Sequence, residues 1–144
     1  MRLFLDANVL FSAAHNPSGN SRALFALADL TQSQLVSSAF AVEEATRNLR
    51  LKYPDAESAL AIPIPKLELA TASDSRAIAT ASAHDLPPKD IPILAGAIAA
   101  TTQVLVTGDQ RHFGPLLGKR VGTLEILTPA QAVLRLLNRL DRQR

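Results

Sequence analysis

The chain has 144 residues, of which 47% are hydrophobic and 19% charged, a balance typical of a globular protein rather than a disordered one. It contains no cysteine, which excludes disulfides, thiolate nucleophiles and cysteine-based zinc sites. The formal charge of +2 and the pI of 9.4 are compatible with a polyanionic partner but are weak evidence for one. No apolar run reaches the length of a membrane span and no signal peptide is recognisable, so we expect a cytoplasmic protein with no membrane contact.

Short apolar runs alternate with helical patterns along the chain. The first strand is expected at residues 2–6, and residues 15–21 are expected to form a loop because they are rich in Asn, Ser and Gly. Residues 62–70 are expected to be extended, because proline disfavours helical backbone in the residue before it. The other predicted helices are residues 22–30, 39–53, 54–60, 74–83, 91–101 and 129 onwards, and the other predicted strands are residues 34–37, 66–69, 103–107 and 123–127.

Strands that alternate with helices are typical of a mostly parallel sheet that is covered on both faces. We therefore predict an α/β fold with three layers, α/β/α, around a mostly parallel central sheet. The sequence shows no repeat, linker or break in composition, so residues 1–144 are expected to form a single domain.

Two aspartates flank a predicted helix and the strand that follows it. Asp90 precedes the apolar run IPILAGAIAA, and Asp109 follows the strand QVLVT. A helix of about 11 residues covers roughly 16 Å, and a strand of about five residues returns about the same length. Because the strand runs back antiparallel to its helix, both aspartates are expected at one edge of the sheet.

Further acids are expected at that same edge. Asp6 ends the first strand, and Glu43 and Glu44 lie within about two turns of the start of the next helix. Several desolvated carboxylates repel one another, and a divalent cation bound by oxygen ligands, Mg²⁺ or Mn²⁺, relieves the repulsion. Each aspartate could instead cap a helix, and the sequence leaves the choice between cap and metal ligand open.

The remaining charged residues carry less information. His15, His84 and His112 lack ligand spacing with one another and are expected at the surface, although His112 could lie near the acids because it follows Asp109 by three residues. Basic residues follow the glutamates and recur in the last helix, where solvated helix faces are the favoured interpretation and binding of RNA or a partner is the alternative. They are Arg47, Arg50, Lys52, Arg135, Arg139 and Arg142.

Four segments, FLDANVL, SSAFAVEEATRNL, LPPKDIPILAGAIAA and VLVTGDQRHFG, resemble in order the acidic motifs of the PIN-domain family. The resemblance extends from Arg2 to about Pro129, and its most specific part is the pairing of D-x-x-I-L-A-x-A with L-V-T-G-D. At this size the chain is similar to the toxin nucleases of bacterial and archaeal toxin–antitoxin pairs. The resemblance implies a metal-dependent ribonuclease with Mg²⁺ or Mn²⁺ as cofactor, RNA as substrate, a possible antitoxin partner and a homodimer.

The resemblance also implies roles for individual residues. Asp6, Asp90 and Asp109 match the family's metal-binding aspartates, and Asn8 and Thr107 match polar residues that would hold the carboxylates by hydrogen bonds. The family's glutamate pattern, E-x-x-R-x-L, fits Glu44 better than Glu43. The catalytic set is then Asp6, Glu44, Asp90 and Asp109.

Two rival functions remain from the residues alone. An aspartyl-phosphate phosphohydrolase would also place an aspartate after the first strand, but the second acid that this class uses two residues later is replaced by Asn8. A non-catalytic RNA-binding or regulatory domain could keep the fold, but it would have no need of the full set of acids.

Overall fold

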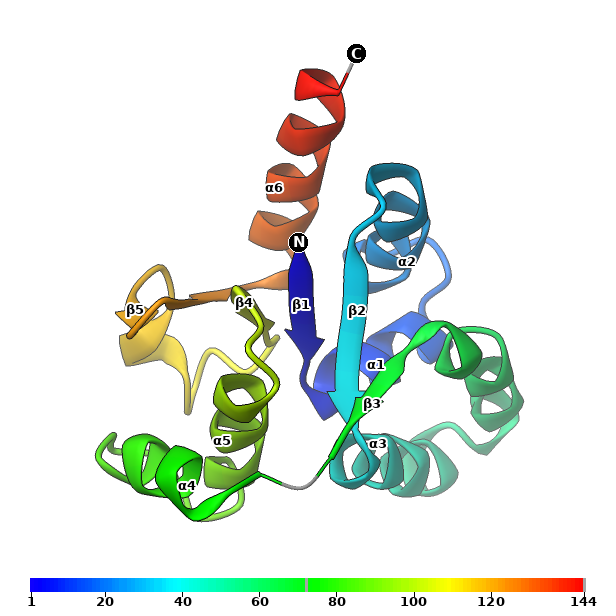
Figure 1. The fold of residues 1–144 in the computed structure, drawn as a ribbon. Coiled ribbons are helices and arrows are strands. Elements are labelled where there is room, and N and C mark those ends of the chain that lie inside the picture. Colours follow the sequence, from blue (N-terminus) through cyan, green and yellow to red (C-terminus); the bar gives the residue numbers. More distant parts are fainter. Residues whose placement is uncertain (72, 144) are drawn as a thin grey trace.

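A computed structural model describes residues 1–71 and 73–143 and contains one six-stranded sheet (Figure 1). The strand order is β3-β2-β1-β4-β6-β5, and neighbouring strands are parallel except β5, which pairs antiparallel with β6. The strands are β1 (Arg2–Leu5), β2 (Gln34–Ser38), β3 (Glu68–Ala70), β4 (Val104–Val106), β5 (Arg120–Val121) and β6 (Leu124–Leu127).

Helices form two groups, one on each side of the sheet (Figure 1). In one group α1 contacts α2 and α3, and α2 packs along α6; in the other α4 packs on α5. The predicted α/β fold with a mostly parallel sheet is confirmed. The helices are α1 (Ala7–His15), α2 (Asn20–Thr31), α3 (Ala39–Lys52), α4 (Ser75–Ser82), α5 (Ile91–Ala99) and α6 (Pro129–Arg142), with 3₁₀ turns η1 (Pro54–Ala61), η2 (Ile64–Lys66) and η3 (Gly114–Leu116).

The chain changes direction across the sheet between β1 and β4. From β1 it adds β2 and β3 on one side, and it then returns to place β4 on the other side of β1. Such a reversal point opens a crevice beyond the carboxyl ends of the two strands, where α/β proteins bind their ligands. Beneath it, Phe4 is fully buried, and Gly96 of α5 lets the helix approach the ring, since a Cβ there would lie 3.2 Å from Phe4.

Helix α1 was absent from the prediction, which assigned no element to residues 7–14. The helix is nonetheless well specified, because the Asp6 side chain accepts a hydrogen bond from the first helical N–H. Its buried residues fall on one face, within an arc of about 160° at about 100° per residue, so the helical spacing is present in the sequence. They are Ala7, Val9, Leu10, Ala13 and Ala14.

Two other local predictions were wrong. Ile62 is helical, with φ −83° and ψ −53°, and η2 follows, so the proline-rich stretch curls into a 3₁₀ turn before β3. On α6 the sequence spacing predicts one apolar face, formed by Ala130, Val133, Leu134, Leu137 and Leu140, but Leu134 is 60% and Leu137 40% accessible, whereas Ala132 and Leu136 are buried. None of the described helices is long and apolar enough to cross a bilayer.

Candidate active site

Asp6 lies at the carboxyl end of β1, and both of its carboxylate oxygens are engaged. Oδ1 accepts a hydrogen bond from the Ala7 N–H at 2.7 Å. Oδ2 accepts from the Thr107 hydroxyl at 2.9 Å and from the Asn8 amide at 3.2 Å. Asp6 is only 4% exposed. The side chain therefore caps α1 and is at the same time fixed against the end of β4.

A second set of hydrogen bonds ties the loop after β4 to this aspartate. The Asn8 Oδ1 accepts from the Gly108 N–H at 2.7 Å, and the Thr107 Oγ1 accepts from the Asp109 N–H at 3.1 Å. A Cβ at position 108 would lie 3.3 Å from Asn8 Oδ1, so a glycine lets the two segments approach. Asn8 and Thr107 together hold the start of α1 and the loop after β4 in a fixed relative position.

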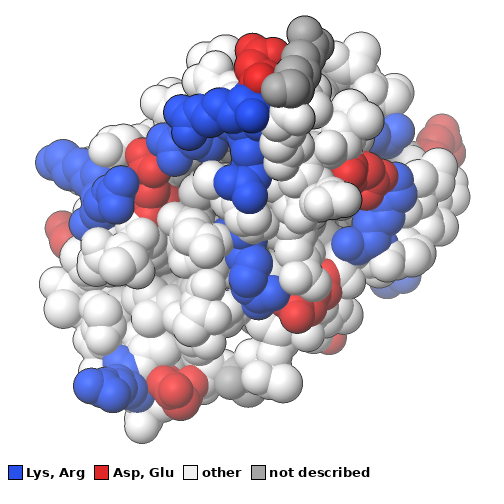
Figure 2. Space-filling model, turned by 45° about the horizontal axis from the view of Figure 1, so that its top comes forward, with Lys and Arg blue, Asp and Glu red and all other residues white. Residues whose placement is uncertain are grey.

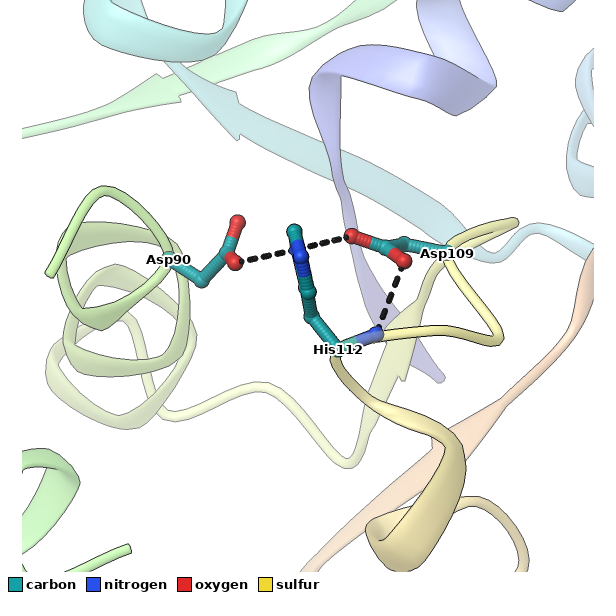
Figure 3. A group of neighbouring side chains, drawn as sticks. All are labelled: Asp90, Asp109 and His112. Atoms are coloured by element: carbon teal, nitrogen blue, oxygen red, sulfur yellow. Dashed lines mark hydrogen bonds and ion pairs between the residues drawn. The ribbon is translucent and has the colours of Figure 1, made fainter. Parts of the chain in front are cut away.

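Asp90 and Asp109 reach the same place from α5 and from the loop after β4, and His112 lies between them (Figure 3). His112 Nδ1 is 2.9 Å from Oδ2 of Asp90 and 2.9 Å from Oδ2 of Asp109. Asp109 Oδ1 accepts the backbone N–H groups of Arg111 at 3.1 Å and His112 at 3.0 Å. Asp90, by contrast, makes no capping hydrogen bond to α5. Its carboxylate therefore has no structural role in starting that helix.

The adjacent glutamates of α3 have different surroundings. Glu44 is partly buried and lines a cavity of about 380 Å³ together with Asp6, Asp90 and Asp109, whereas Glu43 is exposed to solvent. The negative charges of Asp90 and Glu44 contribute to the raised pKa of Asp6, as expected for carboxylates that repel one another across a short distance. Four carboxylates from four separate segments thus face one cavity.

Burial changes the acidity of two of these groups. Desolvation raises the pKa of Asp6 to about 6, although the hydrogen bonds from Thr107 and Ala7 oppose the rise. Burial also raises the pKa of Asp90, an effect that the charge of Asp109 reinforces and His112 opposes. Burial thus makes ionisation of these two carboxyl groups unfavourable, and a bound cation would offset that cost.

The residues present fit a divalent cation. Asp90 Oδ2 and His112 Nδ1 are buried and make no hydrogen bond of acceptable geometry within the described residues, although they lie close together. Oxygen and nitrogen atoms of Asp90, Asp109 and His112 converge within 4.8 Å of one another. Carboxylate oxygens and an imidazole nitrogen are ligands of divalent metals, and a buried lone pair without a donor is satisfied by such an ion.

One wall of the cavity continues along α3 away from the acids. Glu44, Asn48 and Lys52 follow at intervals of four residues on one helix face, and all three line the cavity. The Lys52 ammonium lies 5.8 Å from the centre of the Phe11 ring, which lines the cavity too. Tyr53 continues this surface: its ring lies 5.9 Å from that of Phe11 and stacks on His15 at 3.7 Å.

The other basic residues named from the sequence lie elsewhere. Arg50 pairs with Glu57 at 2.7 Å, and Arg135 of α6 makes two hydrogen bonds to the Glu125 carboxylate at 2.8 and 3.0 Å. Helix α6 extends toward the amino ends of the strands, and Figure 2 shows Lys and Arg side chains on that face with Asp and Glu between them. The acidic cavity has only Lys52 and Lys89 as basic residues in its wall.

His112 lies beside the acids, as its position three residues after Asp109 allows, but sequence reasoning assigned no role to its side chain. Its position three residues after Asp109 was noted, but its second neighbour, Asp90, is 22 residues away in the chain. The contact with Asp90 depends on how α5 packs beside the loop after β4, which spacing alone does not reveal. One feature of the sequence could have indicated it: an aspartate after a glycine favours a turn. In the structure, the Asp109 side chain accepts two backbone N–H groups and turns the following residues back toward it.

Comparisons with known proteins place this geometry in context. A search of curated proteins found no match. Among solved structures, VapBC2 from Rickettsia felis bound to a DNA fragment from its promoter is similar, with a TM-score of 0.65 and 16% identity over 89% of this chain and 98% of that chain. VapBC-1 from nontypeable Haemophilus influenzae gives a TM-score of 0.59 and 15% identity over 90% of this chain and 99% of that chain. At such identities the likeness concerns the fold.

The family is shown by sequence as well as by fold. A family model described as PIN domain matches residues 2–111, which include β1, β4 and all four carboxylates of the cavity. This stretch is well over half of the chain. The chain therefore belongs to the PIN domain family.

Proposed function

We propose that the chain is a metal-dependent endoribonuclease that hydrolyses RNA phosphodiester bonds, as a toxin-type PIN domain. The observation that carries the proposal is the convergence of Asp6, Glu44, Asp90 and Asp109 on one cavity, where the buried Oδ2 of Asp90 has no hydrogen-bond partner among the described residues. Membership of a nuclease family supports it. The proposal extends to a cytoplasmic location, since none of the described helices could span a membrane.

In this proposal Asp6, Asp90 and Asp109 hold Mg²⁺ or Mn²⁺. The ion supplies Lewis acidity: it lowers the pKa of water and offsets negative charge on the phosphoryl oxygens. Asn8 and Thr107 keep the Asp6 carboxylate in one orientation through the hydrogen bonds at 3.2 and 2.9 Å. Glu44 accepts a hydrogen bond from the attacking water, and no residue forms a covalent intermediate.

The α3 wall supports a nucleic acid rather than a small phosphate ester. From Glu44 to Lys52 the helix rises about 12 Å, long enough for about three nucleotides at the spacing of about 3.4 Å in a helical strand. Lys52 would meet a backbone phosphate, and Phe11 and Tyr53 beside it could contact a base. A phosphate monoester would leave most of this surface unused.

An aspartyl-phosphate mechanism is supported less well. Both oxygens of Asp6 already accept hydrogen bonds from the chain, and the residue two positions later, Asn8, donates to Asp6 and cannot act as a general acid. An aspartyl-phosphate enzyme forms a covalent phosphate on its aspartate, and a metal-dependent nuclease does not. Phosphate trapped on Asp6 after turnover would therefore contradict the nuclease proposal.

The adjacent glutamates provide a matched test. Glu44→Gln is expected to lower the rate of Mn²⁺-dependent cleavage of a structured RNA about 100-fold, because it replaces a negatively charged carboxylate in the cavity by a neutral amide, which is a weaker acceptor for the attacking water. Glu43→Gln makes the same chemical change on the exposed neighbour and should cleave at the wild-type rate. Both rates are measured with purified protein in EDTA, Mg²⁺ and Mn²⁺. Cleavage in EDTA, or equal rates for the two variants, would contradict the proposal; binding of RNA without cleavage would favour a regulatory domain.

Lys52 tests the position of the RNA. Lys52→Glu is expected to raise KM roughly five- to tenfold with little change in kcat, and to lower the slope of log KM against log salt by about one. Arg47→Glu, an exposed residue of α3 outside the cavity wall, is the control for the change in charge. If both variants raise KM equally, the general field of α3 rather than a contact at Lys52 attracts the substrate.

A protein partner is part of the proposal. Exposed leucines on the adjacent helices α2 and α6, with Leu30 62% and Leu134 60% accessible, offer apolar surface for a second copy of the chain or for an antitoxin. The mass of the purified chain by light scattering tests the homodimer, and a monomer at all concentrations would remove it.

A further inference from the structure

The arrangement around His112 cannot be explained by hydrogen bonds alone. Its Nδ1 lies 2.9 Å from a carboxylate oxygen of Asp90 and 2.9 Å from one of Asp109 (Figure 3). A hydrogen on Nδ1 could serve only one of these oxygens well, and neither Nδ1 nor Asp90 Oδ2 has a hydrogen-bond partner of acceptable geometry in the described chain. With the hydrogen on Nε2, three sets of lone pairs face one another, and a cation between them would stabilise this arrangement.

The separations match those of ligands on one ion. An octahedral ion with metal–ligand distances of about 2.1 Å holds neighbouring donor atoms about 3.0 Å apart. Both of the distances from Nδ1 to the carboxylates agree with this spacing, and all three donor atoms lie within 4.8 Å of one another. Asp90 is 8% exposed, so its unpartnered oxygen is well removed from solvent.

The chain also fixes His112 in place. Its backbone N–H donates to Asp109 Oδ1 at 3.0 Å, and the next residue, Phe113, is fully buried and donates its N–H to the Asp109 carbonyl oxygen at 3.2 Å. The imidazole is therefore held on the same short turn as one of its carboxylate neighbours.

We infer that His112 is a metal ligand through Nδ1, and that it makes the site select Mn²⁺ or a similar transition-metal ion over Mg²⁺. The inference rests on the proposed metal-dependent function and adds a nitrogen donor to an otherwise all-oxygen site. Imidazole binds transition metals well, whereas Mg²⁺ favours oxygen donors and water. The carboxylates alone would accept either ion.

Pulsed electron paramagnetic resonance of the full chain loaded with Mn²⁺ tests the ligand directly. We expect modulation from a coordinated ¹⁴N nucleus in the wild type and in His84→Ala, whose histidine does not belong to the cluster of Asp90, Asp109 and His112, and none in His112→Ala. His112→Gln retains a side chain of similar length and provides the same comparison if the alanine variant unfolds. Absence of the nitrogen signal in the wild type, or its persistence in both His112 variants, would overturn the inference.

Metal affinities test the selectivity. His112→Ala is expected to weaken binding of Mn²⁺ at least tenfold and binding of Mg²⁺ less than about threefold, as measured by calorimetric titration of the metal-free chain. Equal weakening for both ions would mean that His112 only positions Asp90 and Asp109, and the inference would fail. Neither measurement uses RNA. A nitrogen signal without cleavage would refute the nuclease alone, and cleavage without that signal would refute the ligand alone.

Discussion

Asp6→Asn is expected to reduce Mn²⁺-dependent RNA cleavage by about 1,000-fold or more while the protein remains folded. The loss corresponds to about 4 kcal/mol of transition-state stabilisation. Asp6 is the acid at the reversal point of the sheet, held by the Thr107 hydroxyl at 2.9 Å and the Asn8 amide at 3.2 Å. An amide in its place keeps the shape and the Ala7 cap but removes the negative charge that a cation needs.

The control for this prediction is Asp85→Asn. Asp85 is an exposed aspartate in the loop before α5 and lies outside the cavity wall, so the same chemical change there should leave cleavage unaltered. Initial rates are measured over a titration of Mn²⁺, because a variant that only weakens metal binding recovers activity at high concentration. Circular dichroism checks that both variants are folded. Cleavage by Asp6→Asn at the wild-type rate would remove Asp6 from the site.

The edge of the sheet that carries the acids could be predicted from the sequence, because each inference behind that prediction uses only neighbouring residues. Asp6 directly follows the apolar run of the first strand, Asp109 follows the β-branched run QVLVT after one glycine, and equal lengths of helix and strand return Asp90 to the same edge. The choice between cap and ligand could not be made. The structure gives Asp6 a capping hydrogen bond and gives none to Asp90, a difference that depends on the side-chain rotamer and on the packing of α5.

The errors share a physical cause, which is packing between elements that are distant in the chain. Helix α1 is the exception, because its one-sided apolar spacing is present in the sequence. Leu134 on α6 faces solvent although its spacing fits an apolar face. The His112 contacts arise in the same way, from two segments that meet only in the folded chain. Local periodicity predicts which elements form but not which of their faces find partners.

The acids of the cavity also destabilise the metal-free protein, and the pKa of Asp6 gives the size of the effect. Burial raises this pKa from 3.8 to about 6, so the folded state binds a proton more tightly than the unfolded state. Between these two values folding takes up a proton, and stability therefore falls as the pH rises. Above pH 6 the ionised carboxylate costs the fold on the order of 3 kcal/mol relative to acid pH.

Asp6→Asn is accordingly expected to stabilise the metal-free chain at pH 8. The gain should be about 1–2 kcal/mol, less than the full penalty, because the amide cannot accept the Asn8 hydrogen bond at 3.2 Å as a carboxylate oxygen does. For a domain of this size the midpoint of thermal unfolding should rise by about 2–8 °C in EDTA. At pH 4, where Asp6 is largely protonated in the folded state, the gain should nearly vanish.

Manganese should reverse the order of stability. A cation that binds only the folded state stabilises the wild type by mass action, and the variant lacks the charge to bind it. We therefore expect the wild type to melt above Asp6→Asn in millimolar Mn²⁺ at pH 8 and below it in EDTA. A gain in EDTA that is the same at pH 4 and pH 8 would show that the desolvated charge is not its cause. If addition of Mn²⁺ reverses the order of the two melting midpoints, the ion is what offsets the repulsion among the buried carboxylates.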